Sequence, residues 1–205
     1  MEYNCTYEKK DSVTKLEKYE WDNTWLEQTA DAEKPRVLYI GDSISGGIRL
    51  QAQNNPNNKL LFERFGTSKA VDNAFFIESL RLFTKQQGRR DLIVFNNGLH
   101  GWHLDDVVDY GMHYENMVKF LLEEYAGTPL ALVLTTSVAG ERNERVIVRN
   151  EVVKKIAVKY SLPVIDLYAS SVECFELYAN DGIHFKEEGY AKLAEKFLES
   201  IYQIL

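Results

Sequence analysis

Cysteine is scarce in this chain of 205 residues, which contains only Cys5 and Cys174. Two cysteines are too few for a disulfide framework, so we expect both to be reduced thiols. The 24 lysine and arginine residues are outnumbered by 31 aspartate and glutamate residues. The resulting net charge of −7 argues against a nucleic-acid partner, which requires a basic stripe, and against an anionic membrane surface.

Long apolar runs are also absent. The N-terminus lacks the apolar core of a signal peptide, and the longest weakly charged stretch, residues 128–140, is too short for a membrane-spanning helix. The sequence as written therefore predicts a cytoplasmic protein, although a chain whose signal peptide had been removed would give the same prediction. The length and the hydrophobic content of 45% fit one globular domain with its own core.

Apolar runs alternate with amphipathic stretches from residue 36 onward. Runs typical of buried strands cover residues 37–40, 60–65, 92–95, 130–135 and 163–167, and helical spacing covers 71–83, 105–125, 144–160 and 186–202. This order predicts an α/β fold, a three-layer α/β/α sandwich whose central, mainly parallel sheet has about five strands. Residues 1–35 are polar, with Trp21 and Trp25 at a helix-like spacing. We interpret them as an N-terminal extension that packs through these tryptophans on a domain of residues 36–205.

Ligands bind at the carboxyl ends of the strands in such sheets, so we expect the chemistry in the loops that follow them. Gly41-Asp42-Ser43-Ile44 directly follows the first strand, which places the Ser43 hydroxyl at the mouth of a site beside the N–H groups of a helix start. Ser45 stands where the G-x-S-x-G pattern has its second glycine, so the usual nucleophile elbow is disfavoured. Taken alone, such a serine is more often a helix cap.

Asp181 and His184 lie in the polar loop before the last helix. A serine hydroxyl is a poor nucleophile until a base takes its proton, and the base needs an acceptor on its other ring nitrogen. An aspartate three residues before the histidine can supply that acceptor from one local turn. The simpler interpretation of the pair is a helix cap beside an exposed histidine, but together with Ser43 the pair predicts a catalytic triad.

The two segments, Gly41-Asp42-Ser43-Ile44 near the start and Asp181-x-x-His184 near the end, resemble the SGNH (GDSL-type) hydrolases in order and spacing. The resemblance covers residues 36–205. It implies a flavodoxin-like three-layer fold, ester hydrolysis without a metal or another cofactor, and an oxyanion hole with three donors.

The resemblance also assigns these donors. The backbone N–H of Ser43 is the first, and Gly66 after the second strand is the second, although a plain turn explains Gly66 equally well. Gly98 matches the glycine of the third block, but His100 stands where the family has asparagine. A neutral imidazole can donate one N–H, so we expect His100 to be the third donor. The alternatives are Asn96 and Asn97.

Four residues are candidate substrate contacts: Asp42, Gly98, Trp102 and Asn150. Trp102 can stack on a sugar ring, and Trp21 and Trp25 can fold over the same mouth, although aromatic side chains more often pack in a core or a lid. Asn150 falls in the helix after the fourth strand, where a solvated face is the simpler interpretation.

The expected function is hydrolysis of short-chain acyl esters, and Trp102 favours a carbohydrate O-deacetylase acting on acetylated saccharides. The alternatives are a lysophospholipase- or thioesterase-type acyl hydrolase and a non-catalytic glycan-binding protein that keeps the fold. No spacing typical of a metal or nucleotide site is present. The expected partner is therefore a small ester, and neither nucleic acid nor a membrane is expected to bind. Whether the protein forms a homo-oligomer stays open.

Overall fold

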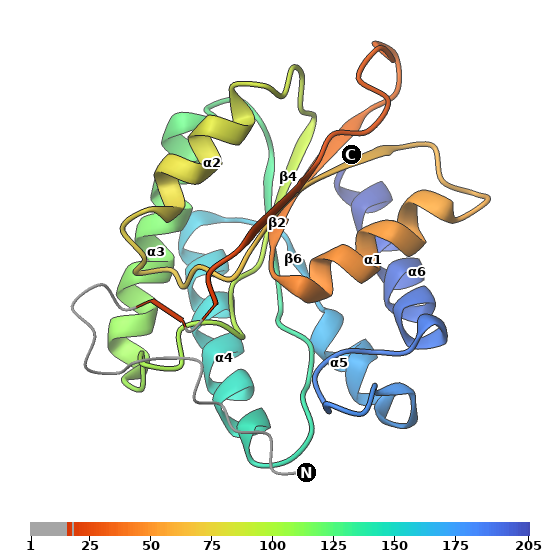
Figure 1. Ribbon diagram of the computed structural model, residues 1–205. Coiled ribbons are helices and arrows are strands. Elements are labelled where there is room, and N and C mark those ends of the chain that lie inside the picture. Colours follow the sequence, from red (N-terminus) through yellow and green to blue (C-terminus); the bar gives the residue numbers. More distant parts are fainter. Residues whose placement is uncertain (1–15, 18) are drawn as a thin grey trace.

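The computed structural model describes residues 16, 17 and 19–205, so Cys5 lies outside the described residues. Within this part of the chain one sheet is formed by β1 (Asp22–Trp25), β2 (Arg36–Gly41), β3 (Leu61–Thr67), β4 (Leu92–Phe95), β5 (Leu130–Val133) and β6 (Val164–Ile165). The strand order is β1-β3-β2-β4-β5-β6, and every neighbouring pair is parallel except β1 with β3. Figure 1 shows helices on both sides of this sheet, so the expected three-layer α/β/α sandwich is confirmed.

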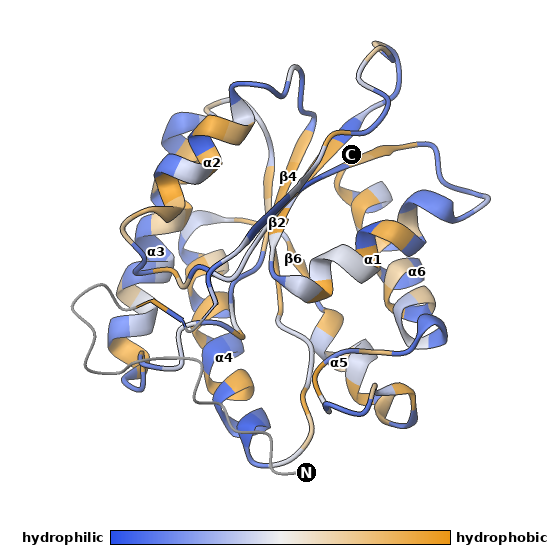
Figure 2. Ribbon diagram, viewed as in Figure 1, coloured by the Kyte–Doolittle hydropathy of each residue, from blue (hydrophilic) through white to orange (hydrophobic). Residues whose placement is uncertain are grey.

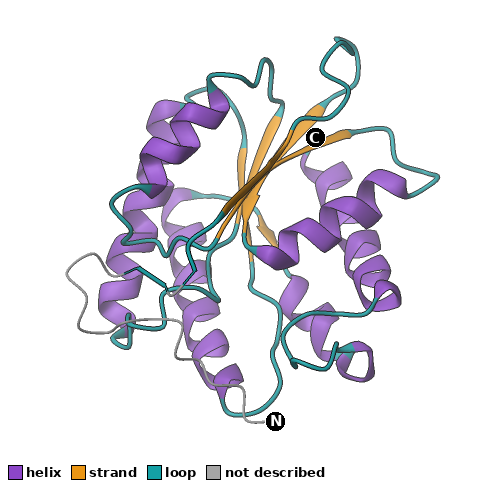
Figure 3. Cartoon of the chain, viewed as in Figure 1, coloured by secondary structure: helices purple, strands orange, loops and turns teal. Residues whose placement is uncertain are grey.

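Each face of the sheet has its own hydrophobic core. One face is covered by α1 (Ser43–Asn54), α5 (Leu167–Val172) and α6 (Glu187–Ile204), and the other by α2 (Phe76–Thr84), α3 (Val107–Glu124) and α4 (Arg142–Tyr160); a 3₁₀ turn spans Phe175–Leu177 (Figure 3). Side chains of a strand point alternately to its two faces, so Val37 and Tyr39 enter the first core while Leu38 and Ile40 enter the second. Hydrophobic and hydrophilic residues alternate along the helices (Figure 2), and each helix contributes buried apolar side chains to the cores.

Several boundaries differ from those that the sequence predicts. Helix α2 begins at Phe76 rather than at residue 71, because Asn73 forms a turn in which its side chain accepts the Phe75 N–H and its carbonyl accepts the Phe76 N–H. Strand β3 continues to Thr67, two residues beyond its predicted end. No helix in the described part of the chain is long and apolar enough to cross a bilayer.

The helix-like spacing of Trp21 and Trp25 is misleading, because Asp22–Trp25 is an edge strand. This strand, β1, adds a sixth member to the sheet and pairs antiparallel with β3. The Trp21 backbone is tied to Ser68 in both directions: its N–H donates to Ser68 Oγ at 2.8 Å, and its carbonyl accepts the Ser68 N–H at 3.1 Å. Trp25 remains 48% exposed and lies under the guanidinium of Arg49.

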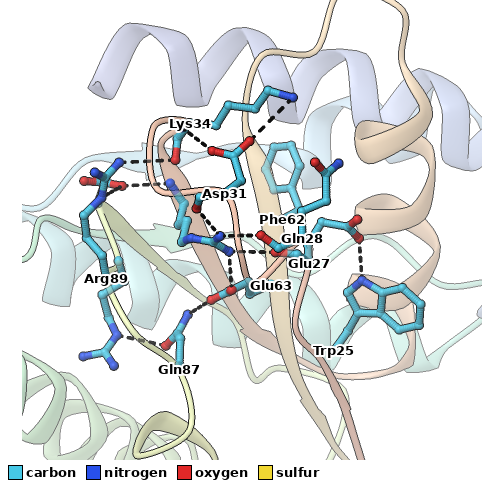
Figure 4. Close-up of polar contacts among 12 residues, drawn as sticks. Trp25, Glu27, Gln28, Asp31, Lys34, Phe62, Glu63, Gln87 and Arg89 are labelled. Carbon is cyan, nitrogen blue, oxygen red and sulfur yellow. Dashed lines mark hydrogen bonds and ion pairs between the residues drawn. The ribbon is translucent and has the colours of Figure 1, made fainter.

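A buried charge network fixes the rest of the extension to the sheet. Arg36 donates to the backbone carbonyls of Glu27, Gln28 and Asp31 and pairs with Glu63 at 2.7 Å. Glu63 is only 2% exposed, and Figure 4 shows Gln87 donating to it from the other side. Arg36 therefore holds residues 27–31 to the body of the domain, and Glu27 also pairs with Arg49 of α1.

The sheet has a switch point at β2, its central strand. The chain runs from β2 to β3 on one side and then crosses to β4 on the other. Loops that leave neighbouring parallel strands in opposite directions open a crevice at the strands' carboxyl ends. Ser43 starts α1 directly after β2, and the segment that contains His100 follows β4, so both border this crevice.

Candidate active site

The structure brings Ser43, His184 and Asp181 together. The Oγ atom of Ser43 lies 2.8 Å from Nε2 of His184, and Nδ1 of His184 lies 2.6 Å from Oδ2 of Asp181. Ser43 is the first residue of α1, so its backbone N–H has no acceptor within the helix. This geometry allows His184 to take the Ser43 proton while Asp181 holds the ring in the required tautomer.

The turn that carries Asp181 and His184 is held by its own backbone. Oδ1 of Asp181 accepts the N–H groups of Ile183 and His184, each at 2.9 Å. Burial raises the pKa of the Asp181 carboxyl, but the hydrogen bonds from the His184 ring and from these two N–H groups outweigh it and leave the pKa below its ordinary value. Gly182 has a φ of +68°, and its carbonyl accepts the Ala139 N–H at 2.7 Å. Asp181 and His184 thus sit in one turn that backbone hydrogen bonds hold in place.

Arg64 supports the loop that precedes Ser43 through hydrogen bonds. Its guanidinium donates to the Asp42 carbonyl at 2.7 Å, to Ser45 Oγ at 2.9 Å and to Asn23 Oδ1 of β1 at 2.6 Å. The Ser45 hydroxyl in turn donates to the Asp42 carbonyl. Ser45, the residue that departs from the nucleophile-elbow pattern, therefore links the buried arginine to the loop that positions Ser43.

Gly66, the predicted second oxyanion donor, lies inside β3 rather than in a turn after that strand. It pairs with Gly41 of β2 on one side and with Asn23 of β1 on the other. The Leu61 N–H donates toward β2 and the Ser68 N–H toward β1, and N–H groups alternate in direction along a strand. This alternation turns the Gly66 N–H toward β1 and away from the crevice. Gly66 is therefore not presented as an oxyanion donor.

The three candidates for the remaining donor lie in different surroundings. Both amide hydrogens of Asn96 are used, because its Nδ2 donates to the Val133 carbonyl and to Thr135 Oγ1. Asn97 is buried and donates to the Lys69 carbonyl. His100 alone of the three lines a cavity together with Ser43 and His184.

His100 carries a partner that the sequence does not suggest. Its Nδ1 lies 2.6 Å from Oε1 of Glu17, a residue of the N-terminal extension. Burial disfavours the charged ring, but the hydrogen bond and the charge of Glu17, helped by Asp42 and Glu20, outweigh that effect and raise the pKa of His100. The ring of Trp21 meets the His100 ring edge to face.

The cavity has a volume of about 320 Å³, at the lower end of the range for small-molecule sites. Its wall is partly aromatic, from Tyr19, Trp21 and Trp102, and Arg142 contributes a guanidinium. Arg145 stacks over Trp102 at 5.0 Å and donates to its carbonyl, which holds the indole in place. The extension therefore supplies part of the wall through Glu17, Tyr19 and Trp21, a contribution that only Trp21 hinted at in the sequence.

Three of the four predicted substrate contacts have structural roles instead. Asp42 is buried and caps α1 by accepting the Ile44 N–H. Gly98 approaches Thr135 so closely that a Cβ there would lie 1.8 Å from its Oγ1. Both ends of the Asn150 amide bond the Thr135 backbone, so the predicted substrate contact from Asn150 is wrong. Trp102 is the candidate that reaches the cavity.

The helix face around Asn150 is not solvated, because its neighbour Arg149 is only 2% exposed. The Arg149 guanidinium donates to four backbone carbonyls of the segment after β4, those of Gly98, His100, Gly101 and Leu104. It also packs on the ring of Tyr110 at 4.4 Å. The segment that carries His100 is thus gathered around one buried cation.

No group of three or more His, Cys, Asp or Glu side chains among residues 16, 17 and 19–205 is arranged to hold a metal ion. The other histidine near the crevice, His103, is buried against Asp72 with Nε2 2.7 Å from Oδ2. The cavity brings together Ser43 and two histidines, each hydrogen-bonded to a carboxylate.

The sequence matches no protein-family model, and no curated protein is similar to it. Solved structures are similar in fold. A lipase/acylhydrolase from Enterococcus faecalis superimposes with a TM-score of 0.65 at 17% identity, over 83% of this chain and 97% of that one. An acetyl xylan esterase, AlAXEase, gives 0.62 at 16% identity, over 81% and 99%. A catalytic mutant of Axe2, an acetylxylan esterase from Geobacillus stearothermophilus, gives 0.61 at 15% identity, over 85% and 96%.

These likenesses establish the fold. The chain has the α/β/α architecture of lipolytic and acetylxylan-esterase structures, as the resemblance to SGNH hydrolases implies.

Proposed function

We propose that this protein is a serine esterase that hydrolyses short-chain acyl esters, with Ser43 as the nucleophile, His184 as the base and Asp181 as its orienting acid. The observation that carries the proposal is the pair of hydrogen-bond distances, 2.8 Å from Ser43 to His184 and 2.6 Å from His184 to Asp181. A histidine within reach of a serine hydroxyl and of a carboxylate is the arrangement that nucleophilic catalysis by serine requires.

The reaction has two halves. Ser43 Oγ bonds to the ester carbonyl carbon while its proton passes to Nε2 of His184, and negative charge collects on the carbonyl oxygen. The bond to the alcohol then breaks, and His184 gives the proton to the departing alcohol. A water molecule next gives a proton to His184 and attacks the acyl carbon, and the bond to Ser43 Oγ breaks as His184 passes that proton to Oγ, which releases the acid and restores Ser43.

The substrates that we propose are acetylated saccharides. Tyr19, Trp21 and Trp102 supply aromatic surface on which a sugar ring can stack, and the acetylxylan esterases with this fold support the same class. Glu17, His100 and Arg142 in the cavity wall disfavour a long acyl chain, because charged groups gain nothing from contact with methylene groups. A lysophospholipase is the weaker candidate for that reason.

Two assays test the proposal. A fluorophosphonate probe should label Ser43, and His184→Ala should abolish the labelling, whereas a glycan-binding protein without turnover would not label. Acetate release should then be measured on acetylated xylo-oligosaccharides beside a chain-length series of p-nitrophenyl esters. A preference for acyl chains longer than about eight carbons would reject the deacetylase proposal, since a chain of that length needs an apolar channel.

A further inference from the structure

Glu17 and His100 line the same cavity as Ser43, and the reaction steps proposed above do not use their hydrogen bond. Their side chains are only 10% and 16% exposed, and 2.6 Å separates Oε1 from Nδ1. Glu17 is held in turn by its own backbone, whose N–H donates to Oε1 of Glu20 at 3.0 Å. The pair therefore joins the N-terminal extension to the catalytic cavity through a short hydrogen bond.

The hydrogen bond to Glu17 decides what the His100 ring can donate. A carboxylate only accepts, so the proton of this bond sits on Nδ1. In the neutral ring Nε2 would then be an acceptor, and only the imidazolium has a second N–H at Nε2. Nε2 forms no hydrogen bond with the described part of the chain and is not shut off from the cavity.

The charges around the ring favour the imidazolium. Glu17 faces it from the extension, Glu20 from the same extension, and Asp42 from the loop after β2, and these three raise the pKa of His100 against the effect of burial. Two cations are near. Arg149 of α4 donates to the His100 carbonyl rather than facing the ring, and Arg142 lies elsewhere in the cavity wall.

His184 is the third basic group of the same cavity, and Asp181 balances the charge that it acquires during the reaction. Each of the two histidines therefore has a carboxylate of its own, so that both can be positively charged when the oxyanion forms between them. Charge-assisted hydrogen bonds are roughly twice as strong as neutral ones.

We propose, on the basis of the esterase function above, that Glu17 holds His100 as an imidazolium whose Nε2–H binds the oxyanion together with the Ser43 N–H. His100 is then a catalytic residue and Glu17 a positioning residue. Pairing with β1 turns the Gly66 N–H away from the crevice, so that Gly66 does not bind the oxyanion. The charged His100 donor compensates for the loss of that hydrogen bond. His100 keeps its proton in both halves of the reaction, since the transferred proton moves only among Ser43, His184, the alcohol and water.

The proposal predicts an alkaline limb in the pH profile of kcat. The imidazolium is lost as pH rises through the pKa of His100, so activity falls on the alkaline side. Glu17→Gln removes the negative charge, lowers that pKa and moves the fall to lower pH. At a pH between the falls of the two proteins we expect kcat for p-nitrophenyl acetate to drop by up to about 10²-fold, the typical cost of one oxyanion donor, with little change in KM.

Two further variants serve as controls. Glu27→Gln makes the same change elsewhere in the extension, at a side chain that contacts Trp25 and Arg49 and not the cavity, and should leave kcat and the pH profile unchanged. His100→Asn replaces the ring with a side-chain amide, whose N–H donors do not depend on pH. The pH profile of kcat for this variant should have no alkaline limb, and adding Glu17→Gln to it should lower kcat no further. His100→Asn also tests the proposal if Glu17→Gln does not fold.

The histidine ring signals in NMR give a readout that does not depend on turnover. His100 should titrate at higher pH in the wild type than in Glu17→Gln. Equal titration in the two proteins, a rise in KM without a change in kcat, or an equal loss from Glu17→Gln in the His100→Asn background would each overturn the proposal. Failure of the esterase function is distinguishable, because the wild type would then neither label at Ser43 nor turn over, and that result would overturn both.

Discussion

Gly182→Ala is expected to damage both stability and activity, because the alanine meets two separate obstacles. Gly182 has a φ of +68°, a left-handed conformation that costs a residue with a Cβ about 1 kcal/mol or more. A Cβ at this position would also lie 2.8 Å from Cβ of Ala139, closer than two such atoms approach in real structures. Relieving that overlap requires the turn that carries Asp181 and His184 to move.

The two costs can be separated within this chain. Gly127 has a φ of +89° with no atom near an added Cβ, so Gly127→Ala should cost about 1 kcal/mol from backbone strain alone. Gly182→Ala adds a steric cost of about 1–3 kcal/mol, for a total of about 2–4 kcal/mol. Ala139→Gly removes the clashing methyl group, so the double variant Gly182→Ala/Ala139→Gly should recover most of the steric part.

Urea unfolding measures the stability, and kcat for p-nitrophenyl acetate measures the position of His184. A displacement of about 1 Å at a catalytic group costs roughly 10²-fold in rate, so Gly182→Ala should lose about that factor while Gly127→Ala keeps its activity. The reasoning is refuted if Gly182→Ala and Gly127→Ala are destabilised equally, or if Ala139→Gly restores nothing.

Three other predictions concern charged and polar side chains that hydrogen bonds hold in place. Arg36→Met leaves the Glu63 carboxylate buried without its cation and should cost about 3–5 kcal/mol in urea unfolding, much of which Arg36→Met/Glu63→Met should recover; equal losses in both variants would contradict this. Asn150→Leu should lose about 1–3 kcal/mol of stability with KM unchanged, and a raised KM would reinstate a substrate contact. Because folding lowers the pKa of Asp181, its stabilising effect is complete above the unfolded value of about 4 and disappears as pH falls through the folded value. The stability difference between wild type and Asp181→Asn should therefore shrink below about pH 4, and a difference that grew there would reverse the sign of the shift.

The sequence predicts the sheet well where strands are buried on both faces. Residues 37–40 and 92–95 are nearly continuous apolar runs, and they correspond to β2 and β4 within a residue at each end. The edge strand β1 could not be found in this way, because its four residues, Asp-Asn-Thr-Trp, are all exposed and carry no apolar pattern. Its partner β3 and the contacts of Trp21 with Ser68 determine that it is a strand.

The contacts of the candidate site also divide into those that the sequence predicts and those that it does not. Asp181 and His184 lie three residues apart, so local spacing predicts their contact. Ser43 lies 141 positions from His184, and the order of strands and helices with the resemblance to SGNH hydrolases predicts that they meet. The pair of Glu17 and His100 spans 83 positions without any motif, and only the packing of the extension brings it together. A solvated face for Asn150 was the natural expectation in a charged helix. It fails because the Asn150 amide bonds the Thr135 backbone and Arg149 donates to carbonyls of the segment after β4.

The four carbonyl oxygens around Arg149 have a consequence for how the cavity adapts to its contents. Four carbonyls of residues 98–104 accept from this guanidinium, and Arg145 donates to those of Trp102 and Leu104, so moving one part of the segment strains the bonds to the rest. That side of the cavity opens as a unit or not at all. Discrimination among ligands on this side therefore follows from a fixed outline, and adjustment to ligands of different size falls to other lining side chains such as Tyr19, which is 63% exposed.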